Sequence, residues 1–231
     1  MTAHIGIAAC SSEGAALCYR TICTLAMERL GGHRHPEISV HTPPLQDYVD
    51  ALSADNLNRV ADLMLTSARK LAAAGADFVI CPDNTIHAAF ERMLPASPLP
   101  WLHIAEIVAA EAAGRGFTRP AILGTRWLTE SQVYPSALSA VGLDWLVPDL
   151  SDRVEIDRII MQELVAGRVE DASRSVLHEI VAGLAARGAD CALLVCTELP
   201  LIILDGLTVP ALDSTRLLAH AALDHALADK A

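Results

Sequence analysis

Short apolar runs alternate with longer amphipathic segments along the chain. The runs are rich in Ala, Leu, Val and Ile, whereas the longer segments repeat apolar residues at helical spacing. Continuous apolar runs are typical of strands in parallel sheets that helices cover on both faces. The expected strands are residues 5–9, 38–41, 78–81, 121–124, 145–147 and 192–195. The clearest expected helices are residues 55–74, 156–166 and 171–187.

The second part of this pattern repeats the first. Residues 71–84 predict a helix end, a Gly-Ala-Asp turn, an apolar strand and a polar strand end, and residues 184–197 predict the same series. Two further pairs of segments match: residues 100–103 with 210–213, and residues 5–11 with 121–126. The sequence therefore predicts an α/β fold of two pseudo-symmetric halves with mainly parallel sheets.

The repeat also aligns two chemically reactive residues. Asp83 lies eight positions after Gly75, and Cys196 lies eight positions after Gly188. Ligands of open α/β sheets bind beyond the carboxyl ends of the strands. If the halves pack about a pseudo-twofold axis, Asp83 and Cys196 should face each other across one cleft. We expect residues 1–99 with 211–231 to form the half that carries Asp83, and residues 100–210 to form the half that carries Cys196.

Composition narrows the class of protein. Hydrophobic residues make up 52% of the 231 residues and the mean hydropathy is +0.36, which is ample for a buried core. No apolar run reaches the roughly 18 residues that a membrane span needs. The first five residues lack the basic and apolar segments of a signal peptide. We therefore expect no membrane partner and a cytoplasmic location.

Charge and cysteine usage exclude further classes. The formal net charge is -11 and the sequence pI is about 5.2, which disfavours a nucleic-acid partner because phosphate binding needs clustered Lys and Arg. The six cysteines include no Cys-x-x-Cys pair, so a zinc ribbon or a thioredoxin-type motif is not expected. Reduced thiols are the natural state without an export signal.

Two segments at the expected strand ends carry motifs. Residues 83–87 are Asp-Asn-Thr-Ile-His, and residues 196–201 are Cys-Thr-Glu-Leu-Pro-Leu. The segment 83–87 resembles the Cys-Asn-Thr-x-His motif of the aspartate/glutamate racemase superfamily, and the segment 196–201 is similar to its Cys-Thr-Glu-Leu-Pro-Leu motif. Further resemblance covers nearly the whole chain, through residues 11–13, 19–20, 102–104, 123–126 and 147–149.

The resemblance implies a fold and a reaction. It implies two Rossmann-like halves, a homodimer, and amino-acid racemisation without pyridoxal phosphate, any other cofactor or a metal. Two cysteines of the family exchange a proton with the substrate Cα on opposite faces; here Cys196 matches one and Asp83 stands in place of the other. The substrate-binding residues implied by the matched segments are Ser11, Asn84, Thr85, Arg126 and Thr197.

Proton exchange without a cofactor has clear physical requirements. Inversion needs a base on one face of Cα and an acid on the other, and the carbanion must be stabilised by hydrogen bonds to the carboxylate. Both motifs follow strand ends that are expected to open into helix N-termini, which favour anions. The same field should make Cys196 a better base by lowering a thiol pKa from about 8.5.

Asp83 has two interpretations. As an acid/base it would be repelled by an incoming carboxylate, and this repulsion with desolvation would raise its pKa, so that it could donate a proton. Alternatively, it caps the helix that follows. Cys81 could be proposed as a substitute thiol, but the repeat aligns it with Leu194 inside the strand, so we expect a structural role for Cys81.

Other polar residues are expected to be structural. We expect His87 and His103 to be hydrogen-bonded residues near strand ends rather than bases, and Glu198 to satisfy backbone donors. Arg126 either faces the cleft or lies on the surface. The remaining cysteines should pack among apolar neighbours: Cys10, Cys18, Cys23 and Cys191. No His-Glu-x-x-His motif and no glycine-rich phosphate loop are present.

The distal part of the substrate is less constrained. Aspartate racemases of the family commonly hold the distal carboxylate with an Arg and a Lys. This chain has only two lysines, Lys70 on an expected helix and Lys230 near the end, and neither is expected at the cleft. Arg126 is the only cationic candidate in a suitable loop, so a dicarboxylic amino acid is possible but not demanded.

Four functions compete. The first is a racemase acting on an amino acid. The second is another carbanion enzyme of the superfamily, namely a decarboxylase, a cis–trans isomerase or a lyase, which acts on a small carboxylate through one cysteine. The third is a non-catalytic small-molecule binder, and the fourth is a hydrolase with Cys196 as nucleophile, which lacks a recognisable thiol–histidine pair.

Overall fold

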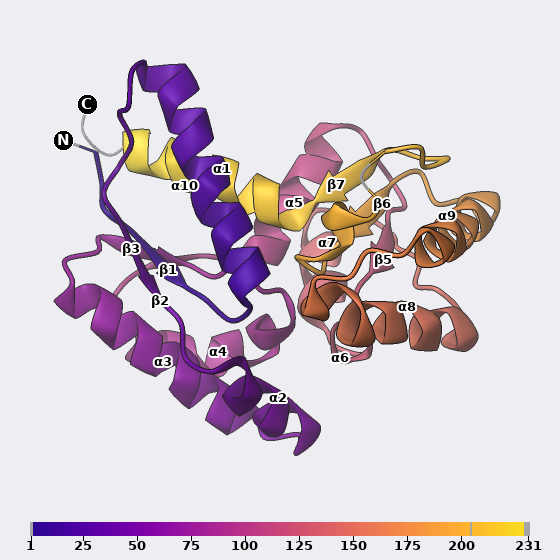
Figure 1. Ribbon diagram of the computed structural model, residues 1–231, viewed down its shortest axis with the longest axis horizontal. Helices are drawn as coiled ribbons and strands as arrows, with labels where there is room; N and C mark the ends of the chain where they lie inside the picture. Colours follow the sequence, from indigo (N-terminus) through magenta and orange to yellow (C-terminus); the bar gives the residue numbers. More distant parts are fainter. Residues whose placement is uncertain (1, 204, 229–231) are drawn as a thin grey trace. The chain divides into compact units, whose positions relative to one another are not determined.

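The computed structural model describes residues 2–203 and 205–228; Lys230 lies outside the described residues. The chain divides into two compact units, which are described separately below. Unit 1 comprises residues Met1–Ile104 and Thr215–Ala231, and unit 2 comprises residues Ala105–Ser214. Figure 1 shows the elements of both units in chain order.

Unit 1 is built on a parallel sheet of four strands in the order β2-β1-β3-β4. The strands are β1 (Ile5–Ala8), β2 (Ile38–His41), β3 (Phe78–Ile80) and β4 (Trp101–Leu102). The helices that connect or cover them are α1 (Ser12–Leu30), α2 (Leu45–Ser53), α3 (Leu57–Ala73), η1 (Thr85–Ala89), α4 (Phe90–Met93), η2 (Leu94–Ala96) and α10 (Ser214–Ala228). Two helices cross a unit boundary: Ile104, the first residue of α5 (Ile104–Gly114), belongs to unit 1, and Ser214, the first residue of α10, belongs to unit 2.

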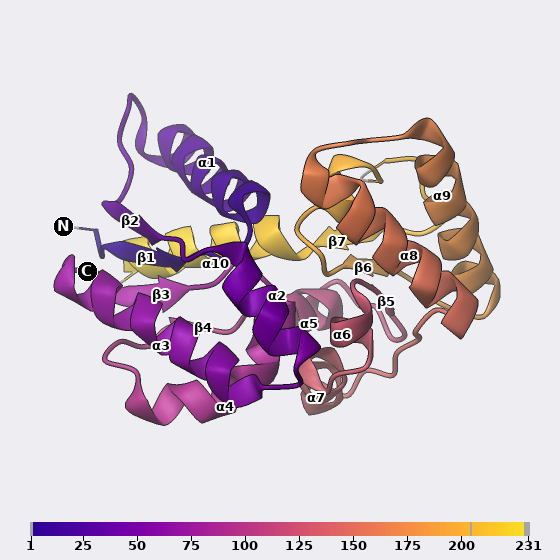
Figure 2. The same cartoon turned by 60° about the horizontal axis from the view of Figure 1, so that its bottom comes forward.

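Side-chain alternation along β1 and β3 explains why both faces of this sheet are covered. Ala8 and Val79 belong to one buried cluster with the apolar face of α3, which includes Met64. Phe78, one residue from Val79, faces the other way and contacts the ring of His225 in α10, with ring centroids 4.5 Å apart. Figures 1 and 2 show α1 and α3 on opposite faces of the sheet.

Unit 2 is built on a parallel sheet of three strands in the order β5-β6-β7. The strands are β5 (Ala121–Leu123), β6 (Ala192–Leu194) and β7 (Ala211–Asp213). Its helices are α6 (Arg126–Thr129), α7 (Val133–Ala140), α8 (Leu150–Gln162), η3 (Leu164–Ala166), α9 (Asp171–Ala186) and η4 (Leu199–Leu201), together with the rest of α5.

The Gly-Ala-Asp repeat has the same local structure in both units. Gly75 and Gly188 follow the ends of α3 and α9 with φ angles of 89° and 97°, a conformation that glycine adopts without steric cost. Asp77 then accepts a hydrogen bond from the backbone N–H of His4, at 2.6 Å. Asp190 accepts one from the backbone N–H of Arg119, at 3.0 Å. Each aspartate thus ties the start of its strand to the chain that enters the neighbouring strand.

The structure differs from the sequence expectations at several places. Strand β4 pairs with β3, and β7 pairs with β6, so the unit boundaries follow Ile104 and Ser214 rather than residues 99 and 210. Residues 145–147 do not form a strand; Leu146 makes only an isolated bridge to Ala121. The expected helix 156–166 begins six residues earlier, at Leu150, and its last turn is the 3-10 helix η3.

Candidate active site

Asp83 lies just beyond the carboxyl end of β3 and is held by the turn that follows it. Its Oδ1 accepts a hydrogen bond from the backbone N–H of Ile86, at 3.1 Å. Its carbonyl oxygen accepts one from Nδ1 of His87, at 2.7 Å, and lies 4.0 Å from the thiol of Cys81. The side chain is half-buried. The capping contact that the sequence allowed is therefore present.

His87 lies beneath this turn in an aromatic cluster. Its ring stacks on Phe90, with centroids 5.5 Å apart and planes 12° apart, and it meets His103 edge-on at 4.7 Å. Burial is the main cause that lowers the pKa of His87 to about 3, and burial lowers the pKa of His103 to about 4. Both rings are therefore neutral at physiological pH, and neither is poised to act as a base there.

Cys81 is fully buried at the end of β3. Burial and the neighbouring Asp83 raise the pKa of the Cys81 thiol well above its usual value, so the thiol stays protonated. Cys10, Cys18 and Cys191 are also buried, whereas Cys23 and Cys196 are partly exposed, and none of the six cysteines forms a disulfide. A structural role for Cys81 fits this environment.

Cys196 follows β6 and contacts an acidic side chain for which the sequence predicted only a structural role. Its thiol donates a hydrogen bond to Oε2 of Glu198, with the sulfur and oxygen 3.0 Å apart. The Thr197 hydroxyl donates to the same oxygen, at 2.7 Å. Glu198 is only 3% exposed. The Glu198 carboxylate thus faces the Cys196 thiol rather than only backbone donors, and a thiol–carboxylate pair of this kind can pass a proton between its members.

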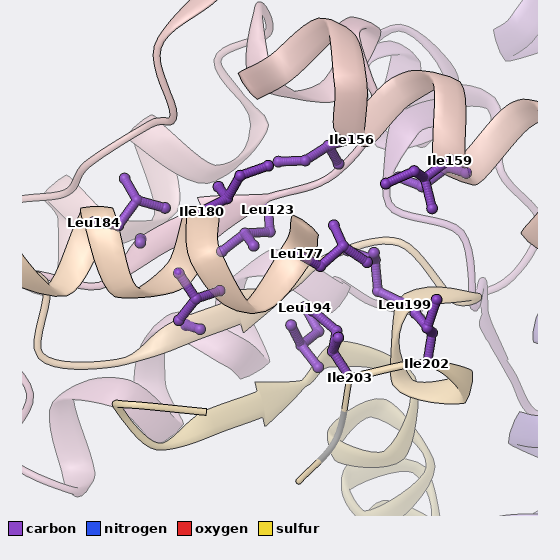
Figure 3. Close-up of a cluster of buried hydrophobic side chains, with 14 of the residues drawn as sticks. Leu123, Ile156, Ile159, Leu177, Ile180, Leu184, Leu194, Leu199, Ile202 and Ile203 are labelled. Atoms are coloured by element: carbon purple, nitrogen blue, oxygen red, sulfur yellow. The ribbon is translucent and has the colours of Figure 1, made fainter. Parts of the chain in front are cut away.

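The hydrophobic core of unit 2 fixes this segment. Leu199, Ile202 and Ile203 are buried directly after the motif. They belong to one cluster with Leu177 of α9 and Leu194 of β6, and Figure 3 shows these side chains converging. The three polar residues of the motif are therefore held between β6 on one side and a buried apolar anchor on the other.

The turns after β1 and β5 are equivalent helix caps. Ser11 accepts a hydrogen bond from the backbone N–H of Gly14 at the start of α1, at 3.1 Å. Thr125 accepts one from the backbone N–H of Leu128 at the start of α6, at 3.4 Å. Thr125, which was not among the residues selected from the sequence, is thus the counterpart of Ser11. Arg126 is exposed, and its guanidinium carbon lies 5.3 Å from the ring centroid of Trp127.

The expected helix N-termini after the two motifs are short 3-10 helices. η4 has three residues, and η1 has five and continues directly into α4 and η2, so neither motif opens into a regular α-helix. Hydrogen-bond donors near the strand ends are instead individual groups. Asn84 and Thr197 are buried beside the reactive residues, and Thr85 is half-buried. Lys70 lies on α3 with its Nζ 3.0 Å from Nε2 of His41.

Two broader properties concern the part of the chain that the structure describes. Within residues 2–203 and 205–228, no group of three or more His, Cys, Asp or Glu side chains is arranged to hold a metal ion. None of the described helices combines the length and hydropathy needed to cross a membrane.

Sequence comparison relates the chain to known proteins. A family model described as Asp/Glu/Hydantoin racemase matches residues 7–222. The Bacillus subtilis (strain 168) protein named broad specificity amino-acid racemase RacX is 25% identical over 199 residues, which cover 84% of this chain and 83% of the relative.

Solved structures share the fold. A Yersinia pestis protein of the Asp/Glu racemase type superposes with a TM-score of 0.88 at 29% identity, covering 97% of this chain and 99% of that one. An aspartate racemase homologue from Pyrococcus horikoshii OT3 gives a TM-score of 0.83 at 24% identity, covering 98% and 100%. The Francisella tularensis glutamate racemase in complex with D-glutamate gives 0.68 at 12% identity, covering 95% and 79%. The chain thus shares the α/β fold with parallel sheets and the organisation in two halves with these structures. It belongs to the Asp/Glu/hydantoin racemase family as an isomerase of the racemase class.

Proposed function

We propose that this enzyme racemises amino acids by exchanging the Cα proton between Cys196 and Asp83, which act on opposite faces of the substrate. The observation that carries the proposal is the contact of the Cys196 thiol with the buried Glu198 carboxylate at the end of β6. In a chain matched to a racemase family over nearly its full length, this pair gives the thiol a local partner for its proton. The proposed reaction uses no cofactor and no metal.

On one face, Glu198 takes the proton of Cys196, and the resulting thiolate removes the Cα proton of the substrate. The thiol donates to Oε2 already, so the proton moves along an existing hydrogen bond of 3.0 Å. Thr197 donates to the same oxygen and helps to hold the carboxylate in place. After inversion Cys196 carries the former Cα proton as a thiol. Glu198 then releases to solvent the proton that it took, and the Asp83 carboxylate regains a proton from solvent, which restores all three groups for the next turnover.

On the other face, Asp83 exchanges the second proton through Oδ2, while Ile86 holds Oδ1. A carboxylic acid is a stronger acid than a thiol, with reference pKa values of about 3.9 and 8.5, and its conjugate base is correspondingly weaker. Asp83 therefore donates a proton to the carbanion readily and removes one from Cα slowly. At saturating substrate the kcat values of the two directions should therefore be unequal, with KM values unequal in the same ratio, because the equilibrium constant between enantiomers is 1.

Stabilisation of the carbanion falls to donors beside the two strand ends. We propose that Asn84, Thr85 and Thr197 donate hydrogen bonds to the substrate α-carboxylate, and that Ser11 contributes from its cap position. Such donors are most effective where developing charge is removed from water. Arg126 is our candidate for a contact with a distal substrate group. The named activity of the Bacillus subtilis relative supports testing many side chains. A homodimer in the cytoplasm remains our expectation for the assembly and location.

The experiment measures deuterium incorporation at Cα in deuterated water, using both enantiomers of each chiral proteinogenic amino acid and a panel of small dicarboxylates. Wild type should incorporate deuterium with inversion, faster from the enantiomer whose proton meets Cys196. Cys196→Ala should abolish inversion while leaving the fold intact. Asp83→Asn should also abolish inversion but retain washout of the single proton served by Cys196, and Asp83→Cys should restore more nearly symmetric exchange.

Two of the alternative functions have their own signatures in this experiment. Loss of carbon dioxide or formation of a double bond from a dicarboxylate would contradict the racemase function. It would indicate a decarboxylase, isomerase or lyase that acts through one cysteine. No exchange from any of these compounds would indicate a binder. Equal exchange from both enantiomers in Asp83→Asn would show that Asp83 is not the second acid/base.

A further inference from the structure

His87, which binds the backbone carbonyl of Asp83, is tightly packed on several sides. His87 is 3% exposed, and its ring is fixed between Phe90 and His103 at centroid distances of 5.5 Å and 4.7 Å. Its Nδ1 lies 2.7 Å from the carbonyl oxygen of Asp83. A carbonyl oxygen can only accept a hydrogen bond, so Nδ1 must carry the ring proton of neutral His87.

The other ring nitrogen follows from this assignment. With the proton on Nδ1, Nε2 is an acceptor only, and it is buried without a hydrogen-bond partner among the described residues. An unpaired buried acceptor is unfavourable, so burial of this imidazole is compensated chiefly at Nδ1 and by ring packing. A phenyl ring would pack as well without that unpaired nitrogen. The feature that distinguishes His87 from a phenylalanine here is its contact with Asp83.

Asp83 is thus held at two points by consecutive residues of one turn. Ile86 binds its carboxyl Oδ1 at 3.1 Å, and His87 binds its carbonyl at 2.7 Å. Fixing the carbonyl fixes the peptide plane, and fixing Oδ1 fixes the rotation of the side chain. Together the two contacts restrict the orientation of the Asp83 carboxyl group.

We infer that His87 is a positioning residue that, through the Asp83 carbonyl, sets the direction of the carboxyl group for proton exchange. The inference rests on the proposed role of Asp83. His87 does not touch the substrate in this scheme and exchanges no proton with it. Misplacement of a reacting group by about 1 Å costs on the order of 10²-fold in rate, so loss of the anchor should be visible in kinetics.

Three substitutions separate positioning from packing. The Asn side chain can place an N–H near the position of Nδ1, the Gln side chain places its amide nearer Nε2, and Phe keeps the ring without a donor. We measure deuterium washout from both enantiomers of the amino acid that wild type exchanges fastest. The enantiomer served by Asp83 is the one whose exchange Asp83→Asn abolishes.

The expected result is selective. His87→Phe and His87→Gln should slow exchange of the enantiomer served by Asp83 by about 10²-fold, while exchange at the Cys196 face changes by less than about threefold. His87→Asn should recover most of the lost rate. Equal slowing of both enantiomers, or no recovery in His87→Asn, would overturn the positioning role, because a merely structural residue affects both faces alike.

A measurement on wild type keeps the inference testable without any variant. ¹⁵N NMR of the imidazole nitrogens distinguishes a proton on Nδ1 from a proton on Nε2. A proton on Nδ1 of His87 supports the anchor, and a proton on Nε2 overturns it, even if no amino acid exchanges and the proposed function fails. Conversely, wild-type exchange of both enantiomers in Asp83→Asn, together with a proton on Nδ1 of His87, would contradict the proposed role of Asp83. It would still support the hydrogen bond from His87 to the Asp83 carbonyl.

Discussion

The buried imidazole of His87 should make the fold sensitive to mild acid. Its pKa is lowered from 6.5 to about 3, mainly by burial. When pH falls below 6.5, the unfolded chain binds a proton at His87 and the folded chain does not. The contribution of the neutral His87 ring to the free energy of unfolding is therefore fully present above about pH 6.5 and is lost as pH is lowered toward 3. At pH 5 the solution is about 1.5 pH units below the unfolded-state pKa of about 6.5. At about 1.36 kcal/mol per unit, the free energy of unfolding falls by about 2 kcal/mol.

Urea denaturation at pH 7.5 and pH 5 measures this loss. The variant His87→Asn cannot titrate, so its free energy of unfolding should fall by about 2 kcal/mol less than that of wild type between the two pH values. The cavity left by the smaller Asn side chain lowers the free energy of unfolding equally at both pH values, so it does not affect the change between pH 7.5 and pH 5. The exposed His33 provides the matched control, and His33→Asn should behave as wild type. An equal loss in His87→Asn and wild type would refute the buried, neutral state of this ring.

Three further predictions concern the motif after β6 and the proposed chemistry. Glu198→Gln removes the acceptor of the Cys196 proton, so washout at the Cys196 face should fall by about 10²-fold with an unchanged circular dichroism spectrum; unaltered washout would exclude Glu198 from proton transfer. Leu199→Ala should destabilise the protein by about 2–5 kcal/mol in urea, because Leu199 is fully buried in the core of unit 2, whereas truncation of the exposed Leu150 should have little effect. Enzyme treated with chelator and hydroxylamine should keep its racemisation rate, and recovery of lost activity by a metal or by pyridoxal phosphate would contradict the cofactor-independent mechanism.

Much of the fold follows from local patterns in the sequence. Five of the expected strands are present in the structure. They could be predicted because each is a short apolar run that ends in polar residues, as in β3 and β6. The Gly-Ala-Asp turns were predicted because glycine after a helix is a strong stop signal. Strand β4 was missed because it has only two residues, Trp101 and Leu102, too few to show any periodicity.

The start of α8 shows why amphipathic patterns mark helix ends poorly. Its first turns carry Leu150 and Val154, which are 65% and 60% exposed, so their apolar side chains do not face the core. The regular pattern begins only at Ile156, which is fully buried, and this is where the sequence places the helix start. Exposed apolar residues therefore moved the predicted boundary by six positions.

The position of Asp83 and Cys196 after strand ends was predictable, but their hydrogen bonds were not. Alignment of the two repeats selected Asp83 and Cys196 from spacing alone. The contact between Cys196 and Glu198 joins residues two positions apart in an irregular segment after a strand, and so no periodic pattern reveals it. The anchor of Asp83 on His87 likewise depends on the 3-10 turn η1, where the sequence predicted the N-terminus of a helix that favours anions.

The two reactive positions differ in what stands two residues later, and this difference makes a last prediction. Cys196 has Glu198 there, whose carboxylate accepts the thiol proton. The equivalent position after Asp83 is Thr85, whose hydroxyl is a far weaker base than a carboxylate. In Asp83→Cys, the new thiol should therefore depend on solvent to lose its proton, and exchange at its face should rise with pH toward the thiol reference pKa of about 8.5. Exchange at the Cys196 face of the same variant should rise much less. Washout of both enantiomers measured from pH 6 to pH 9 tests this, and parallel pH profiles at the two faces would show that Glu198 gives Cys196 no advantage in losing its proton.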